Sequence, residues 1–290
     1  MKFGIYFAFW ETEWKVDYEK YIKKAARLGF DVLEISCAPL PNLSKEQMLT
    51  LKAMAEDYGV TLTAGYGPTA EQNLSSTDPA VVANAKAFFT DILKRLEVMD
   101  IHSIGGGLNS YWPVDFSKPI EKKRDWAIGV DNVRDVAKIA QECGVDYCLE
   151  CLNRYEGYLI NTAAEGVAFC REVGLPNVKL LLDTFHMNIE EDTFYDAIMT
   201  AGPYLRRLHT GEANRRLPGK GRLPWLEIGN ALRDIAFTGD VVMEPFVFEG
   251  GTIGREIKVW RDLSDNADEA QLDQDAQNAL EFSRYVIGKQ

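Results

Sequence analysis

Residues 18–35 read YEKYIKKAARLGFDVLEI, and this stretch contains the unit from which the fold can be predicted. Apolar side chains recur every three or four residues from Tyr18 to Leu28, which is the spacing of one buried helix face. Gly29 follows, and glycine readily adopts the left-handed conformation that ends many helices. Residues 31–35 are then mostly apolar or β-branched, which is typical of a buried strand.

The same order of helix, glycine and strand recurs along the whole chain. Several helix starts carry recognisable caps: Ser44 and Gln47 form a capping box, Asp78 precedes Pro79, and Thr162 precedes another helix. The predicted strands are residues 4–9, 31–35, 60–63, 102–104, 145–150, 178–183, 204–209 and 241–244. The predicted helices are residues 18–28, 44–58, 79–96, one ending at Gly144, 162–173, 194–199, 224–238 and 272–286.

Strands that alternate with helices predict a parallel sheet, and eight such units are the number that closes a barrel. We therefore expect a single (β/α)8 TIM barrel domain over residues 1–290. The longest irregular segments all follow strands, and they lie near residues 66–77, 108–119, 210–223 and 248–268. Because the loops after the strands build the active site of such barrels, the site is expected at that face.

The composition argues against several classes of protein. The 290 residues include 32 Lys and Arg against 44 Asp and Glu, a net charge of -12, so a nucleic-acid partner is not expected. No segment approaches the roughly 18 consecutive apolar residues of a membrane span, and no secretory signal is visible. The five cysteines form an odd set without framework spacing, so we expect reduced thiols and a cytoplasmic location.

The last four predicted strands each end in a residue that can bind a metal: Glu150, Asp183, His209 and Glu244. Neighbouring parallel strands are roughly 4.8 Å apart, so four inward-pointing side chains at consecutive strand ends can converge on one ion. Three clustered carboxylates would repel one another without a cation. Three carboxylates and one imidazole suit Mn²⁺, Co²⁺ or Mg²⁺ better than a structural Zn²⁺.

Other candidate motifs carry less weight. Cys148 and Cys151 match C-x-x-C, but residues three apart on a strand point to opposite faces. The glycines at 105–107 lack the Lys-Ser/Thr of a phosphate loop and instead indicate close backbone approach at a strand end. His102 begins a strand and is expected to be packed or on the opposite face of the barrel, whereas His186 follows a strand at the catalytic face.

Several segments resemble the ketose 3-epimerases, the family of D-tagatose 3-epimerase and D-allulose (D-psicose) 3-epimerase. They are ECLNRYE (150–156), LDTFHMNIEE (182–191), HTGEANR (209–215), PGKGR (218–222) and MEPF (243–246). Further similarity at residues 4–6, 111–113 and 258–262 extends the resemblance over essentially the whole chain. The resemblance is closest to the D-allulose 3-epimerases and implies a xylose isomerase-like barrel.

The resemblance implies one Mn²⁺ or Co²⁺ ion, with Mg²⁺ as an alternative, on the four residues at the strand ends. It also implies that Glu156, His186 and Arg215 hydrogen-bond the O1 to O3 end of a ketohexose substrate. Tyr6, Gly107 and Trp112 would line the pocket for the other end of the sugar. The family further implies a homo-oligomer, either a dimer or a tetramer.

The predicted reaction interconverts D-fructose and D-allulose through an enediolate, formed when the hydrogen on C3 is removed beside the C2 carbonyl. Glu150 and Glu244 would serve as base and acid on opposite faces of the sugar. The alternatives are an epimerase that prefers D-tagatose or D-sorbose, an aldose–ketose isomerase, a sugar or inositol dehydratase, and an inert sugar- or metal-binding protein. A barrel nuclease is disfavoured by the negative charge and the three histidines.

Overall fold

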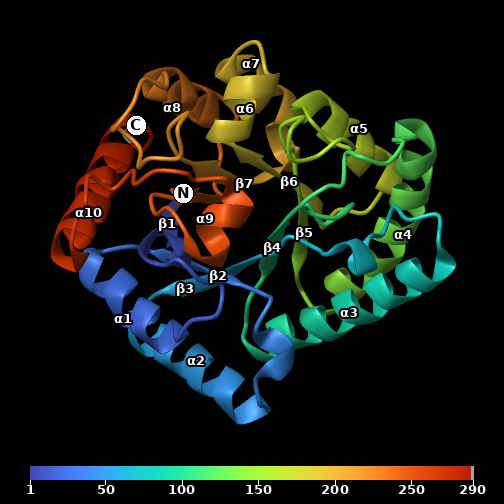
Figure 1. Cartoon of the computed structure of the whole chain (residues 1–290), viewed down its shortest axis with the longest axis horizontal. Helices are drawn as coiled ribbons and strands as arrows, with labels where there is room; N and C mark the ends of the chain where they lie inside the picture. The colour runs from blue at the N-terminus through green and yellow to red at the C-terminus, as the bar shows by residue number, and fades with distance from the viewer. Residues whose placement is uncertain (289–290) are drawn as a thin grey trace.

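The computed structural model describes residues 1–288 and contains a closed barrel of eight parallel strands, ordered β1 to β8. Figure 1 shows the strands at the centre with the helices around them. The predicted (β/α)8 TIM barrel is therefore confirmed. The strands are β1 (Lys2–Tyr6), β2 (Val32–Ser36), β3 (Thr61–Gly65), β4 (Ser103–Gly106), β5 (Asp146–Glu150), β6 (Val178–Asp183), β7 (Leu205–Thr210) and β8 (Asp240–Met243).

Ten α-helices and four short 3-10 helices accompany the strands within residues 1–288. The α-helices are α1 (Tyr18–Leu28), α2 (Lys45–Asp57), α3 (Pro79–Val98), α4 (Lys122–Glu142), α5 (Ala163–Val173), α6 (Thr184–Glu190), α7 (Phe194–Ala201), α8 (Trp225–Asp234), α9 (Gly251–Ile257) and α10 (Glu269–Val286). The 3-10 helices are η1 (Phe7–Trp10), η2 (Leu40–Asn42), η3 (Ala70–Gln72) and η4 (Gly202–Tyr204).

The predicted helix caps are present. Ser44 and Gln47 form a reciprocal capping box at the start of α2, and the Asp78 side chain accepts a hydrogen bond from the first turn of α3. Gly29 and Gly174 end α1 and α5 in the left-handed conformation, with φ of 85° and 75°. Each strand can therefore begin shortly after its helix has ended.

Burial explains why the strands read as mainly apolar runs. Every residue of β2, β4 and β8 is buried, because one face of each strand meets the barrel interior and the other meets the helices. The first and last α-helices of the chain, α1 and α10, are linked by ion pairs. The buried Lys24 ammonium of α1 lies 2.8 Å from carboxylate oxygens of both Glu269 and Asp273 in α10.

The predicted first strand, residues 4–9, is wrong at its C-terminal end, because β1 spans Lys2–Tyr6. β1 ends at Tyr6, and the next four residues form η1, whose side chains are all buried. Phe7 packs edge-on against Tyr18, with ring centroids 5.3 Å apart, so its apolar character reflects helix packing rather than continuation of the strand. The ends of the other strands agree with the prediction to within one or two residues.

Two α-helices were not predicted. α6 follows β6 without an intervening loop, and α9 lies within the segment 248–268 that was expected to be irregular. Each has seven residues, which is too short for a helical period to be evident. His102 was expected to be either packed or on the opposite face of the barrel. It lies just before β4 on the face opposite the site and is exposed, so the second alternative is correct.

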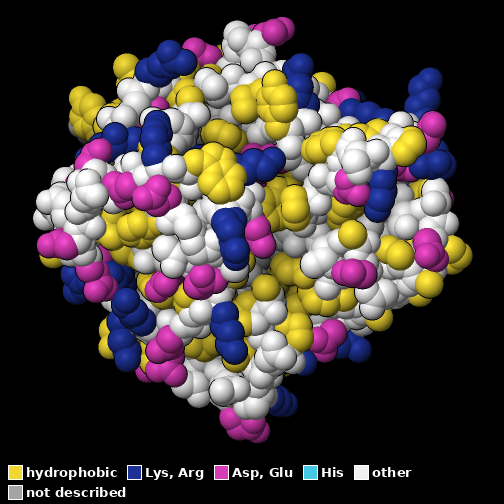
Figure 2. Space-filling view, viewed as in Figure 1, with side chains coloured by type: hydrophobic (Ala, Val, Ile, Leu, Met, Phe, Trp, Pro, Cys, Tyr) yellow, Lys and Arg dark blue, Asp and Glu magenta, His cyan; other side chains and the backbone are white. Residues whose placement is uncertain are grey.

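The surface carries charge of both signs. On the face drawn in Figure 2, acidic and basic side chains are interspersed among hydrophobic and other side chains. Among residues 1–288, none of the helices combines the length and the apolar character needed to cross a bilayer.

Helix packing around the barrel predicts the effect of one substitution. A Cβ at Gly229 of α8 would lie 2.3 Å from the carbonyl oxygen of Val286 in α10. Alanine favours a helix by about 1 kcal/mol over glycine, but this contact would force the two helices apart. We expect Gly229→Ala to lower the free energy of unfolding by about 1–3 kcal/mol in urea denaturation.

The matched control is Gly144→Ala, at a position with φ of 68° and no atom within 4 Å of the added methyl group. It should cost only about 1 kcal/mol, from the left-handed backbone alone. A Gly229→Ala variant more stable than the wild type would contradict the close packing of α8 on α10.

Candidate metal and sugar site

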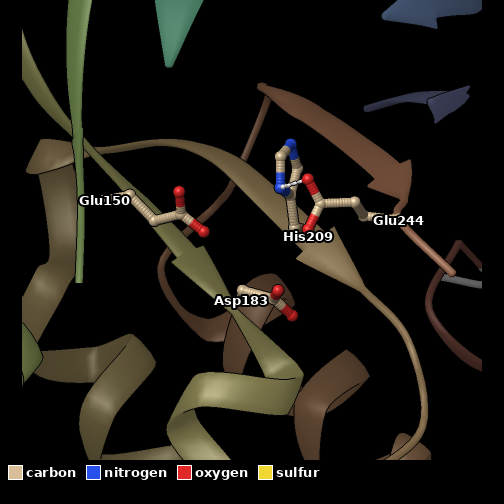
Figure 3. A group of neighbouring side chains, drawn as sticks. All are labelled: Glu150, Asp183, His209 and Glu244. Atoms are coloured by element: carbon tan, nitrogen blue, oxygen red, sulfur yellow. Dashed lines mark ion pairs between the residues drawn. The ribbon is translucent and has the colours of Figure 1, made fainter. Parts of the chain in front are cut away.

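Four side chains from neighbouring strand ends converge at the mouth of the barrel. Glu150 ends β5, Asp183 ends β6, His209 is the penultimate residue of β7, and Glu244 directly follows β8. One ligand atom from each lies within 4.8 Å of the others. Figure 3 shows the carboxylates of Glu150 and Glu244 facing one another, with Asp183 and His209 between them. The strand register explains this, because Asp183 pairs with His209 across β6 and β7.

The electrostatics of this cluster favour a cation. Burial raises the pKa of Glu150 well above its ordinary value, and the negative charges of Glu244 and Asp183 raise it further. Burial alone would lower the pKa of His209, yet the carboxylates of Glu34 and Glu244 together raise it well above its ordinary value. A positive charge among the carboxylate oxygens therefore stabilises this cluster of four side chains.

The donor set also fits a divalent ion. The Nδ1 atom of His209 is buried and has no hydrogen-bond partner, although it lies 3.4 Å from a Glu244 oxygen. A buried polar atom without a partner is costly, and coordination of a metal would satisfy it. Three carboxylates with one imidazole are ligands that suit Mn²⁺ and similar ions, so these residues can hold one metal ion.

Arg215 provides a fixed positive charge beside the cluster. Its Nη1 atom lies 3.1 Å from Asp183 and 3.3 Å from Glu244, and its Nη2 atom lies 3.5 Å from Glu156. The guanidinium also stacks on the ring of Phe185, with 3.8 Å between its carbon and the ring centroid. The Arg215 guanidinium lowers the pKa of Glu156 against the opposing effect of burial.

The loop after β7 holds Arg215 in an unusual backbone conformation. Its φ is 66°, a left-handed value that is uncommon outside glycine. The loop is organised around the buried Glu212 carboxylate, which accepts hydrogen bonds from the backbone of Gly219 and Leu223 and from the Trp225 indole. The Arg215 carbonyl in turn accepts a hydrogen bond from Phe246 after β8. These contacts compensate for the backbone strain and fix the guanidinium.

His186 lies on α6, which Asp183 caps by accepting a hydrogen bond from Phe185. The backbone N–H of Asn153 donates to His186 Nδ1 over 3.3 Å, and the opposite ring nitrogen lies 3.5 Å from Glu150. Burial lowers the pKa of His186, which favours a neutral imidazole. Because Nδ1 accepts the hydrogen bond from Asn153, the proton of the neutral ring lies on Nε2. That proton is aimed toward the cluster.

One cavity at the carboxyl ends of the strands is lined by nearly all of the predicted site residues. Nine of the ten predicted residues line it, namely Tyr6, Gly107, Trp112, Glu150, Glu156, His186, His209, Arg215 and Glu244. Asp183 does not line this cavity, but its carboxylate forms an ion pair with Arg215, which does. Trp112 donates to Glu156 over 3.3 Å, which links the two predicted ends of the sugar pocket.

Sequence reasoning missed part of this cavity. Trp14 and Ile257 line it, and they come from the loop after β1 and from α9. The Trp14 indole donates to Glu256 over 2.6 Å, so these two segments are tied together beside the site. Glu34 also lines the cavity and contacts His209. A lone acid within the apolar strand VLEIS was the available signal, because such a residue is rarely buried without a partner.

Comparison with known proteins assigns the family. The sequence profile described as xylose isomerase-like TIM barrel matches residues 22–270. The D-psicose 3-epimerase of Ruminiclostridium cellulolyticum is 62% identical over 287 residues, which are 99% of this chain and 98% of the relative. The D-psicose 3-epimerase of Agrobacterium fabrum is 56% identical over 288 residues, 99% of this chain and 100% of the relative.

This chain belongs to the ketose 3-epimerase family. It shares a TM-score of 0.98 and 62% identity with a crystal structure described as D-psicose 3-epimerase with D-tagatose from Clostridium cellulolyticum H10, with 99% of both chains covered. The predicted family resemblance is thus confirmed, and this ketose 3-epimerase is an isomerase-class enzyme of the D-psicose type.

Metal binding to this site has a thermodynamic consequence. An ion that binds only the folded state stabilises it by about 2.7 kcal/mol at a concentration of 100 times Kd. We expect Mn²⁺ added to chelator-treated ketose 3-epimerase to raise Tm by roughly 5 °C in calorimetry. Asp183→Asn should lose most of this shift, while an asparagine oxygen still caps α6. An equal shift in wild type and variant would place the binding elsewhere.

Proposed function

We propose that this protein catalyses the C3 epimerisation of free ketohexoses and interconverts D-fructose and D-psicose. The observation that carries the proposal is the pair of opposed carboxylates at Glu150 and Glu244 in a chain 62% identical to a D-psicose 3-epimerase. A second solved relative, 56% identical with a TM-score of 0.98, is described as D-psicose 3-epimerase in the presence of D-fructose. A ketohexose substrate is thus supported by two relatives.

We further propose that Glu150, Asp183, His209 and Glu244 hold one divalent ion, Mn²⁺ or Co²⁺, with Mg²⁺ as an alternative. This rests on their separation of at most 4.8 Å and on the chemistry of their donor atoms. When bound, such an ion acts as a Lewis acid that stabilises negative charge developing on substrate oxygens.

The proton transfers fall to the two glutamates. Removal of the C3 proton by one carboxylate gives an enediolate, and delivery of a proton to the opposite face by the other gives the epimer. Glu150 and Glu244 come from β5 and β8, so a sugar between them presents one face to each. Their roles exchange when the reaction runs backwards.

The remaining predicted residues would bind and orient the sugar. Glu156, His186 and Arg215 lie beside the metal cluster and present hydrogen-bonding atoms toward it, which suits the O1 to O3 end of the substrate. Tyr6, Gly107 and Trp112 line the same cavity and suit the other end. D-tagatose is the second candidate substrate, because a 62% identical relative was solved with that sugar.

We propose that the enzyme functions as a homo-oligomer, a dimer or a tetramer, as the family resemblance implies. Exposed aromatic side chains such as Tyr155 and Trp260 are available for contacts between subunits. Light scattering with sedimentation measures the state directly.

Substitution of the two glutamates tests the proposed mechanism. We expect Glu150→Gln and Glu244→Gln each to lower kcat for D-fructose by about 100-fold or more, because glutamine offers an oxygen but cannot exchange a proton. D-psicose formation is followed by chromatography, and D-fructose binding by calorimetry should persist in both variants.

Glu172→Gln is the matched control, since the side chain of this exposed glutamate on α5 accepts a hydrogen bond from Trp126 on the outside of the barrel. Its kcat should equal that of the wild type. Retention of a substantial fraction of kcat by either active-site variant would refute the assignment of that glutamate.

A further inference from the structure

A group of charged side chains lies buried inside the barrel, beneath the proposed metal site. Glu34 on β2 and Arg207 on β7 are both fully buried, and Arg207 Nη1 lies 3.0 Å from Glu34 Oε2. The same carboxylate oxygen lies 3.1 Å from His209 Nε2. Arg207 and His209 are two residues apart on one strand, so both side chains point into the barrel.

The neighbouring strands leave room for these side chains. A Cβ at Gly65 of β3 would lie 2.7 Å from Glu34 Oε1, and one at Gly105 of β4 would lie 3.0 Å from Arg207 Nη1. A larger residue at either position would displace the charged group. Two interior strands therefore carry glycine where the charged group requires space.

Arg207 holds Glu34 from the far side of the barrel. Its guanidinium crosses from β7 and donates hydrogen bonds to the carbonyl oxygens of Ala64 and Ser103, 3.0 and 3.2 Å away, and to the Thr63 hydroxyl. An apolar layer is the usual filling of such barrels, and a buried ion pair seldom stabilises a protein more than apolar residues of similar volume. The ion pair is therefore better explained by a role in the site than by stability.

We propose that Glu34 is a positioning residue that accepts a hydrogen bond from the Nε2–H group of His209 and so holds the bare Nδ1 atom toward Glu150, Asp183 and Glu244. Arg207 keeps the Glu34 carboxylate in place. Carboxylates that orient metal-binding histidines in this way raise metal affinity in many proteins. The inference rests on the proposed metal site and adds to it two residues that hold one of the proposed ligands in place.

The first test is the affinity for Mn²⁺ of Glu34→Gln. We expect the Kd, measured from the electron paramagnetic resonance signal of free Mn²⁺, to increase about 10- to 100-fold. Glutamine must present either a neutral oxygen or an amide group to the two donors, Arg207 and His209. Asp273→Asn is the control, because it also removes a carboxylate from a buried ion pair, with Lys24, but far from the site.

We expect the control to lose thermal stability without a change in Mn²⁺ affinity. An unchanged affinity in Glu34→Gln would overturn the inference while leaving the proposed metal site intact. Absence of Mn²⁺ binding by the wild type would instead refute the metal site and, with it, the inference.

A measurement on the wild type covers the case in which Glu34→Gln does not fold. In ¹⁵N-histidine-labelled protein loaded with Zn²⁺ as a diamagnetic probe, we expect His209 to carry a proton on Nε2 that exchanges slowly with water. The exposed His102 is the internal reference for fast exchange. A proton on Nδ1 of His209, or an Nε2 proton that exchanges as fast as that of His102, would overturn the inference.

Discussion

Repulsion among carboxylates at the barrel mouth is the constraint on which the rest of the structure depends. Five carboxylates surround the pocket floor, namely Glu34, Glu150, Glu156, Asp183 and Glu244. Within residues 1–288, the guanidiniums of Arg207 and Arg215 are the permanent positive charges paired with this set, and each contacts part of it directly. The negative charge that remains favours binding of a divalent cation, which links metal binding, fold stability and the proposed chemistry.

The barrel meets this constraint by arranging charge in layers. Arg207 and Glu34 lie deepest, His209 lies above them, and the other proposed ligands lie at the strand ends, where the cavity opens. Arg215 reaches the same point from a loop whose backbone is held by Glu212 and Phe246. The strand ends thus fix the four proposed metal ligands, while loops and α6 supply most of the residues proposed to contact the sugar.

The fold and the four strand-end residues could be predicted from sequence because they depend on local signals. Helix caps such as Ser44 and Asp78, and glycines such as Gly29, mark where each unit ends. The helix α6 and the role of η1 could not be predicted, because short helices have no clear period. Glu34 and Arg207 were missed because their pairing depends on the closure of the barrel, which joins residues far apart in the chain.

The most direct test of the central claim follows hydrogen exchange on the substrate. Chelator-treated protein is incubated with D-fructose in D₂O before and after Mn²⁺ is restored, and the sugars are analysed by NMR. Our account predicts that deuterium enters C3 and that D-psicose forms, both only when the metal is present. Exchange at C1 with formation of an aldose, or no exchange with any ketohexose, would contradict it.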